Sequence, residues 1–319
     1  MNKISLITAF LGGVKNRYMQ YHPERSIREK IELAAKVPGV EGLELCYPMD
    51  FENMRELKTL LADKGPGVSA VNARSRRQGR WIRGSFTSES AVERSEVVED
   101  FKRASEAALE VGTSRITTCP LNDGHDYVFE MDYLAAYDYA ADTFHRICSA
   151  SPEVKICIEY KVNDPRTRCL FGTAGETAAF CMEVGAPNLG ATMDFGHSIL
   201  AGERPAQALA LLKRTGSLFY VHLNDNDRNW DWDMLPGAFN LPEMVEFFFY
   251  LKDVGYTDDW YGYDVMSKEV DTVETFDAAV CLTRKIEAMA DKIDRSKMKD
   301  IMKRRNPVAA LSALYDMAF

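Results

Sequence analysis

Eight strand-like segments alternate with eight helix-like segments along most of this 319-residue chain. The strand-like segments are rich in β-branched and other apolar residues, and they cover 3–10, 41–47, 67–72, 114–119, 155–161, 190–195, 218–223 and 260–265. Segments with helical periodicity fill the intervals, at 25–37, 50–63, 90–111, 132–149, 174–185, 204–215, 241–254 and 273–293. Because parallel strands need a crossover helix between them, this order predicts an α/β fold, a (β/α)8 TIM barrel. We expect the barrel to occupy 1–293, with a C-terminal helical extension at 294–319 that packs on the barrel or on a neighbouring subunit.

An open, doubly wound sheet is the competing architecture for the same alternation. No GxGxxG motif follows the first strand-like segment, as a dinucleotide-binding sheet would require. The polar residues that end the later strands would also spread along an open sheet, whereas a closed barrel brings them together. The barrel is therefore favoured.

Composition excludes several classes of partner. The chain has a net charge of −9, whereas a sequence-independent nucleic-acid binder needs a basic face. No stretch of 18 or more apolar residues predicts a membrane span, and the first residues lack the apolar core of a signal peptide. The seven cysteines are scattered without a CxxC spacing, as in reduced cytosolic proteins. We expect a cytoplasmic enzyme for a small molecule, without nucleic-acid or membrane partners.

Residues that commonly bind metals lie at or just after the ends of the last four strand-like segments. They are Glu159 and Lys161, Asp194 and His197, His222, Asp231 and Asp233, and Asp264. Each has an ordinary structural explanation when taken alone: an ion pair, a helix cap, a buried histidine or a solvated loop. At consecutive strand ends of one barrel, however, all of them point to the same mouth. Such an oxygen-rich set favours a divalent ion, Mg²⁺ or Mn²⁺.

The order E-x-K, D-x-x-H, H, D-x-D and a final strand carboxylate resembles the xylose isomerase-like TIM-barrel superfamily of sugar isomerases and epimerases. It is most similar to the two-metal group of xylose isomerase and L-rhamnose isomerase. The resemblance implies a first metal on Glu159, Asp194, His222 and Asp264, and a second on His197, Asp231 and Asp233, with Asp194 bridging. It places Lys161 beside the C1 oxygen of the substrate.

The resemblance implies that the protein is an aldose–ketose isomerase, which moves a hydride between C2 and C1 of an open-chain sugar. Two divalent ions per chain, Mn²⁺ or Mg²⁺ with Co²⁺ as a further option, would polarise the carbonyl and lower the pKa of the C2 hydroxyl. We also expect a homo-oligomer, a dimer or a tetramer.

Other residues of the predicted mouth are candidates for the substrate pocket. His125 is a candidate catalytic and pocket residue, and His22 a second pocket histidine. Trp81, Trp230 and Trp232 lie in long loops, where each ring would either stack on a sugar or anchor its loop. The arginine run Arg74, Arg76, Arg77, Arg80 and Arg83 is open to two interpretations, a solvated or subunit-contacting loop, or a clamp for an anionic substrate group.

Three alternatives remain. A one-metal ketose 3-epimerase or keto-sugar isomerase, acting on a neutral or anionic sugar, would use Glu159 and a strand-eight acid as an acid/base pair; here that acid is Asp264, where such enzymes have glutamate. A metal-dependent endonuclease on this barrel would need more than the five histidines present. A sugar-binding protein without catalytic activity would have little use for a lysine among metal ligands. The metal content separates these: two ions for the isomerase, one for the epimerase, three for the nuclease and none for the binding protein.

Overall fold

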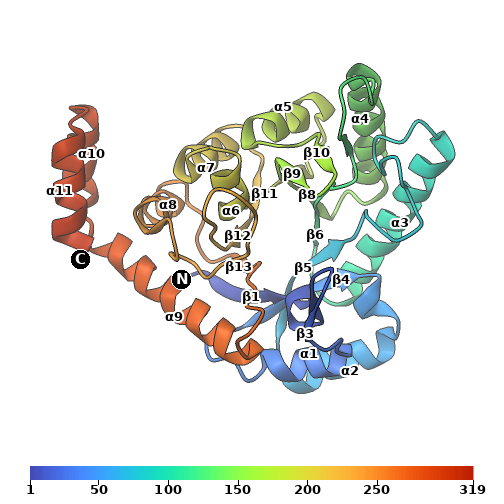
Figure 1. Ribbon diagram of the computed structural model, residues 1–319, viewed down its shortest axis with the longest axis horizontal. Coiled ribbons are helices and arrows are strands. Elements are labelled where there is room, and N and C mark those ends of the chain that lie inside the picture. The colour runs from blue at the N-terminus through green and yellow to red at the C-terminus, as the bar shows by residue number, and fades with distance from the viewer. Residues whose placement is uncertain (319) are drawn as a thin grey trace.

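The computed structural model describes residues 1–318, and its centre is a closed barrel of eight parallel strands (Figure 1). Around the barrel the strand order is β1-β13-β12-β11-β8-β6-β5-β4. In chain order the strands are β1 (Lys3–Ile7), β4 (Gly42–Tyr47), β5 (Gly67–Ala73), β6 (Arg115–Thr118), β8 (Lys155–Glu159), β11 (Leu189–Asp194), β12 (Leu218–Leu223) and β13 (Trp260–Tyr263). The predicted TIM-barrel fold is confirmed.

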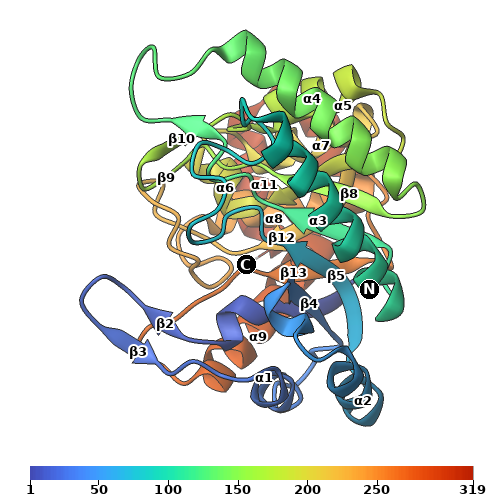
Figure 2. The same cartoon turned by 90° about the vertical axis from the view of Figure 1, so that its right-hand side faces the viewer.

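Helices form the outer layer around these strands (Figures 1 and 2). They are α1 (Ile27–Ala34), α2 (Met54–Lys64), α3 (Ala91–Glu110), α4 (Tyr133–Ala150), α5 (Ala174–Val184), α7 (Pro205–Arg214), α8 (Leu241–Asp253) and α9 (Thr272–Lys292). A further short helix, α6 (Phe195–Leu200), follows β11 directly and was not expected from the sequence. It matters for the site because the residue that caps it, Asp194, is a predicted ligand.

Local signals explain why the helices begin and end where they do. Ser26 and Glu29 form a capping box at the start of α1, since each side chain accepts from the other's backbone N–H. At the end of α2, Gly65 has φ of 75°, the left-handed conformation that glycine adopts without strain. Signals of this kind are local, so the sequence predicts most helix boundaries closely.

Small strands and turns lie in the loops that follow the carboxyl ends of the barrel strands. A hairpin of β2 (Val14–Lys15) and β3 (Gln20–His22) follows β1 and the short helix η1 (Thr8–Leu11), and η2 (Met49–Phe51) follows β4. A three-stranded sheet joins β7 (Gly124–His125), β10 (Thr167–Cys169) and β9 (Asn163–Asp164). These segments therefore surround the predicted site.

The barrel interior is packed in layers of side chains from facing strands, as in other barrels. One layer is a polar triangle in which Ser5, Ser69 and Tyr220 exchange hydrogen bonds of 2.8–3.1 Å. Two residues after Tyr220, and therefore on the same side of β12, His222 begins the next layer towards the carboxyl ends. That next layer carries the predicted site.

Two more helices follow α9: α10 (Arg295–Lys303) and α11 (Pro307–Ala318). In Figure 1 they stand at one side of the ring of helices. The last residue of the expected extension, Phe319, lies outside the described residues. Within the described chain, no helix has the length and apolar character that crossing a membrane requires.

Candidate metal centre

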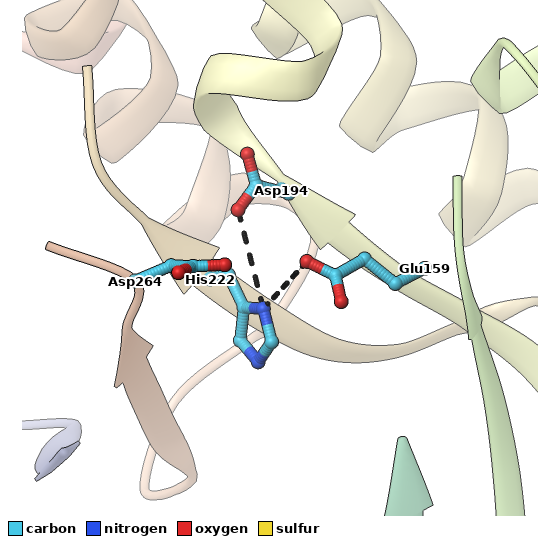
Figure 3. Close-up of side chains that lie close together, drawn as sticks. All are labelled: Glu159, Asp194, His222 and Asp264. Atoms are coloured by element: carbon cyan, nitrogen blue, oxygen red, sulfur yellow. Dashed lines mark hydrogen bonds and ion pairs between the residues drawn. The ribbon is translucent and has the colours of Figure 1, made fainter. Parts of the chain in front are cut away.

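Four side chains from four neighbouring strands meet at the carboxyl end of the barrel (Figure 3). Glu159 ends β8, Asp194 ends β11, His222 lies in β12 and Asp264 follows β13. Each offers one ligand atom, and these atoms all lie within 4.8 Å of one another. The structure thus brings together the set predicted for a first metal.

Asp194 is fixed through both of its carboxylate oxygens. Its Oδ1 accepts from the backbone N–H of His197 at 2.7 Å, which caps helix α6. Its Oδ2 accepts from the side-chain amide of Asn224 at 3.1 Å. The fixed rotamer points Oδ2 towards Nδ1 of His222, at 4.0 Å.

His222 is held between two carboxylates, one of which the sequence analysis missed. Nδ1 lies 3.0 Å from Glu159 Oε1, and Nε2 lies 3.0 Å from Oε2 of Glu44, a fully buried residue of β4. Thr117 and Asn72 also donate to the other oxygen of Glu44. Burial alone lowers the pKa of His222, but Glu44 and Glu159 together raise it well above its usual value. The only signal for Glu44 in the sequence is a charged residue inside the apolar run GLELCY.

Lys161, His197 and Asp231 form a second cluster beside the first. Lys161 Nζ lies 2.8 Å from Asp231 Oδ2, and His197 Nε2 lies 3.2 Å from the same oxygen. Burial lowers the pKa of His197, but Asp194 and Asp231 raise it to about 10. In the described part of the chain, the three predicted ligands of the second metal do not converge as tightly as the first four do.

Asp233 and Asp264 form no ion pair within 4.0 Å with any of the described residues. Burial, with Asp231 and Asp264 nearby, raises the pKa of Asp233 well above its usual value. Burial, with Glu159 and Asp194, raises the pKa of Asp264 to about 8. The pKa of Glu159, in contrast, is lowered to about 2: burial raises it, but His222, His197 and Lys161 outweigh that effect. Carboxylates crowded in this way are stabilised by a divalent cation.

Within residues 1–318, three potential ligand atoms in the site have no hydrogen-bond partner. Among the described residues, buried Oδ1 atoms of Asp231 and Asp264 and Nδ1 of His197 have no hydrogen-bond partner. Buried polar atoms are rarely left in this state, because each costs its desolvation free energy. All three are normal ligand atoms for a hard or borderline divalent ion. The residues present therefore fit the predicted group.

Asp225, which was not predicted from the sequence, stabilises the loop that carries Asp231 and Asp233. Asp225, fully buried, accepts from the backbone N–H groups of Phe239 and Asn240 at 2.8 and 3.0 Å. Its backbone also pairs with that of Met234 in both directions at 2.9 Å. The 223–240 segment is therefore an ordered part of the barrel mouth.

The cavity above the cluster has a volume of about 450 Å³, including space open to solvent. Its wall is formed by Ile7, Phe10, Asn72, Arg74, Arg76, Cys119, Leu121, Glu159, Lys161, His197, Asp231, Asp233 and Asp264. The two arginines belong to the run whose role the sequence left open.

The aromatic and histidine candidates for the pocket are not among those wall residues. Trp81 is 2% exposed and its ring packs under Arg80, so it anchors the loop after β5. His22 faces the backbone oxygen of Ser267 at 3.2 Å, and His125 packs on Tyr133. Trp232 is 47% exposed and donates to Asp227, while Trp230 is partly buried in the same loop. Their roles in substrate binding stay predictions.

Two sequence comparisons find similarity to xylose isomerase-like proteins. The family model described as xylose isomerase-like TIM barrel matches residues 31–285. The xylose isomerase of Thermus thermophilus is 23% identical over 209 residues, which cover 64% of this chain and 54% of that enzyme. The match thus spans about half the length of this relative.

Solved structures show the same fold at low identity. The structure of an L-ribulose 3-epimerase superposes with a TM-score of 0.70 at 18% identity, covering 96% of this chain and all of that one (100%). A structure of the IolI protein with a zinc atom gives a TM-score of 0.68 at 16% identity, covering 90% of this chain and 98% of the other.

Proposed function

This chain belongs to the xylose isomerase-like TIM barrel family, and from that premise we propose that it is a metal-dependent aldose–ketose isomerase for an open-chain sugar. The observation that carries the proposal is the surplus of acid at the mouth. Asp231 and Asp233 stand beside the four-residue cluster, and the pKa of Asp233 is raised by burial and by its acidic neighbours. One ion on the four-residue cluster would leave Asp233 without an ion-pair partner among residues 1–318, whereas a second ion would supply one.

In this proposal Glu159, Asp194, His222 and Asp264 would hold the first metal. His197, Asp231 and Asp233, together with Asp194, would hold the second. When bound, divalent ions supply Lewis acidity to the sugar carbonyl and its neighbouring hydroxyl.

The protein residues would then orient the sugar and stabilise charge. Lys161 keeps its proton, because Asp231 raises its pKa despite the burial that lowers it. Its ammonium would donate to the C1 oxygen as negative charge develops there. Donor and acceptor carbons belong to one molecule, so the hydrogen would move between them without a nicotinamide.

The second candidate, a one-metal ketose epimerase, is favoured by a different observation. The four-residue cluster alone makes a complete site, and Glu159 and Asp264 lie within it as a potential acid/base pair. Similarity to an L-ribulose 3-epimerase fits this reading. In that case the hydrogen would pass through a carboxylate and exchange with water.

Reaction in D₂O separates the two candidates. A panel of aldoses and ketoses is incubated with the Mn²⁺-loaded protein, and the products are analysed by NMR. The isomerase reading expects C1/C2 interconversion with little solvent deuterium at C1, and no turnover after EDTA treatment. Inversion at a single carbon with near-stoichiometric deuterium would establish the epimerase instead, and full turnover by the metal-free protein would refute both.

Metal content gives an independent test. We expect two divalent ions per chain in the wild type and one in Asp233→Asn, with turnover reduced by about two or more orders of magnitude because one Lewis acid is lost. Asp227→Asn, in the same loop but not in the cavity wall, should keep both ions. One ion in the wild type, or wild-type turnover in Asp233→Asn, would reject the two-metal assignment.

A further inference from the structure

Two arginines follow β5 and reach the cavity above the acidic cluster. Arg74 and Arg76 lie one and three residues after Ala73, the last residue of β5. Both form part of the cavity wall, together with Glu159, Asp233 and Asp264. Cations of this kind are not needed as ligands of a metal.

The neighbouring arginines of the same run have structural partners. Arg77 forms an ion pair with Asp100, and Arg80 forms one with Glu96 at 3.0 Å. These two contacts join the loop to helix α3. The structural interpretation of the run therefore accounts for Arg77 and Arg80.

Arg74 and Arg76 have no such partner. Among residues 1–318, neither guanidinium lies within 4.0 Å of a carboxylate oxygen. Their contacts are long ones of 3.5 Å, from Arg74 to the Cys46 sulfur and from Arg76 to the backbone oxygen of Cys119. Asp231, in contrast, has Lys161 as a close cation.

Two positive groups that share a cavity repel each other. Desolvation and the nearby charge of Arg74 lower the pKa of Arg76. Burial also lowers the pKa of Arg74, but Cys46, Asp264 and Glu159 raise it above its usual value. A planar guanidinium binds carboxylate or phosphate oxygens through paired hydrogen bonds, which makes an oxyanion the matching ligand. Charge repulsion from Asp233 and Asp264 would keep such an oxyanion on the arginine side of the cavity.

We propose that Arg74 and Arg76 form an anion subsite, and that the substrate is a sugar with a carboxylate or phosphate group at the end opposite to its reacting carbons. This inference rests on the proposed sugar function and specifies its substrate class. The apolar wall residues Ile7, Phe10 and Leu121 lie in the same cavity, where C–H groups of the sugar chain can pack.

Calorimetric titration of the Mn²⁺-loaded protein tests the subsite without any turnover. The ligands are a five-carbon alditol, the aldonate of the same length and the alditol phosphate, all of which lack a reactive carbonyl. At least one anion should bind about 10- to 100-fold more tightly than the alditol, as expected for charge-assisted hydrogen bonds. Which anion binds more tightly distinguishes a sugar acid from a sugar phosphate.

Variants decide whether the arginines, and not the metal, recognise the anion. Arg74→Gln and Arg76→Gln should each reduce the preference for the anion about tenfold or more, with Arg76→Lys in between because it keeps the charge but loses the paired donors. Arg83→Gln, an exposed position of the same loop outside the cavity wall, should bind as the wild type does.

Three results would overturn the subsite: equal affinity for the alditol and both anions, no binding of either anion, or an anion preference that survives in Arg74→Gln and Arg76→Gln. Failure of the subsite and failure of the proposed function are distinguishable. Turnover of neutral sugars without an anion preference would leave the isomerase standing, whereas arginine-dependent anion binding without sugar isomerisation would leave the subsite standing.

Discussion

Glu44 and His222, 178 positions apart in sequence, form a buried pair that orients the imidazole. With Nε2 directed at Glu44, the ring presents Nδ1 to Glu159 and Asp194. A carboxylate behind a histidine ligand fixes its tautomer and increases its basicity. Glu44 is therefore a positioning residue in our reading and not a ligand.

We predict that Glu44→Ala weakens Mn²⁺ binding about 10- to 100-fold, the usual effect of removing such a partner. Isothermal titration of metal into EDTA-stripped protein measures this, with circular dichroism to verify folding. Glu44→Gln, which keeps an acceptor oxygen, should lie between the alanine variant and the wild type. Glu52→Ala, at an exposed position just before α2, serves as the control. An unchanged metal affinity in folded Glu44→Ala would contradict the positioning role.

The acids and histidines of the site also predict a pH dependence of stability in the metal-free protein. In the folded protein, burial and the charges of Glu159 and Asp194 raise the pKa of Asp264 to about 8, from about 3.9 in the unfolded chain. Protonated Asp264 therefore stabilises the fold fully below about pH 3.9, and this contribution is lost as the pH rises towards about 8. His197, raised to about 10 by Asp194 and Asp231 against the effect of burial, loses its contribution above its unfolded pKa of about 6.5. Both groups therefore contribute less to the free energy of unfolding as the pH rises.

Thermal unfolding in EDTA should therefore show a lower Tm at pH 9 than at pH 6, and saturating Mn²⁺ should reduce this difference because the metal binds the deprotonated ligands. Asp264→Asn should flatten the metal-free profile. A metal-free Tm that rises between pH 6 and pH 9 would be inconsistent with these shifts.

At the scale of single elements, strand β13 leaves space for His222, the proposed metal ligand on the neighbouring strand β12. A Cβ atom on Gly262 would lie 2.7 Å from Cδ2 of His222 and 2.9 Å from the hydroxyl of Tyr220. Both contacts are too short for real atoms, and both neighbours are fully buried. Glycine at this position is thus a packing requirement of the site layer.

Gly262→Ala is expected to displace the His222 ring and so to lower both Tm and Mn²⁺ affinity, with an overpacking cost of about 1–3 kcal/mol. Differential scanning calorimetry and metal titration would measure the two effects. Gly175→Ala in helix α5 is the matched control, because its added Cβ would meet no atom closer than 3.9 Å. If Gly262→Ala had the Tm and the Mn²⁺ affinity of the wild type, glycine would not be required at this position.

At the scale of the whole molecule, the C-terminal helices present apolar side chains outside the barrel. Val308 and Leu311 on α11 are 74% and 55% exposed. We propose that 294–319 is an extension through which the chain forms its homo-oligomer. Exposed apolar residues on one helix are typical of such contacts.

Sedimentation analysis should then find an oligomer for the wild type and a monomer for the double variant Val308→Glu/Leu311→Glu. Val92→Glu, on the exposed face of α3, should leave the oligomer intact. A wild-type monomer, or an oligomer that tolerates both charges, would remove α11 from the interface.

Sequence alone determined the barrel and the order of the proposed ligand residues, because strand and helix periodicity and helix caps are local properties of the chain. Residues at strand ends could be assigned to one mouth because a closed parallel sheet leaves them no other place; this is why Glu159, Asp194, His222 and Asp264 were predicted together and are found together. Only the tertiary structure decided which partners these residues have. The contacts of Glu44 with His222 and of Lys161 with Asp231 depend on the spacing across the barrel. The same holds for the arginine run, in which only packing separates the arginines paired with helix α3 from those that line the cavity.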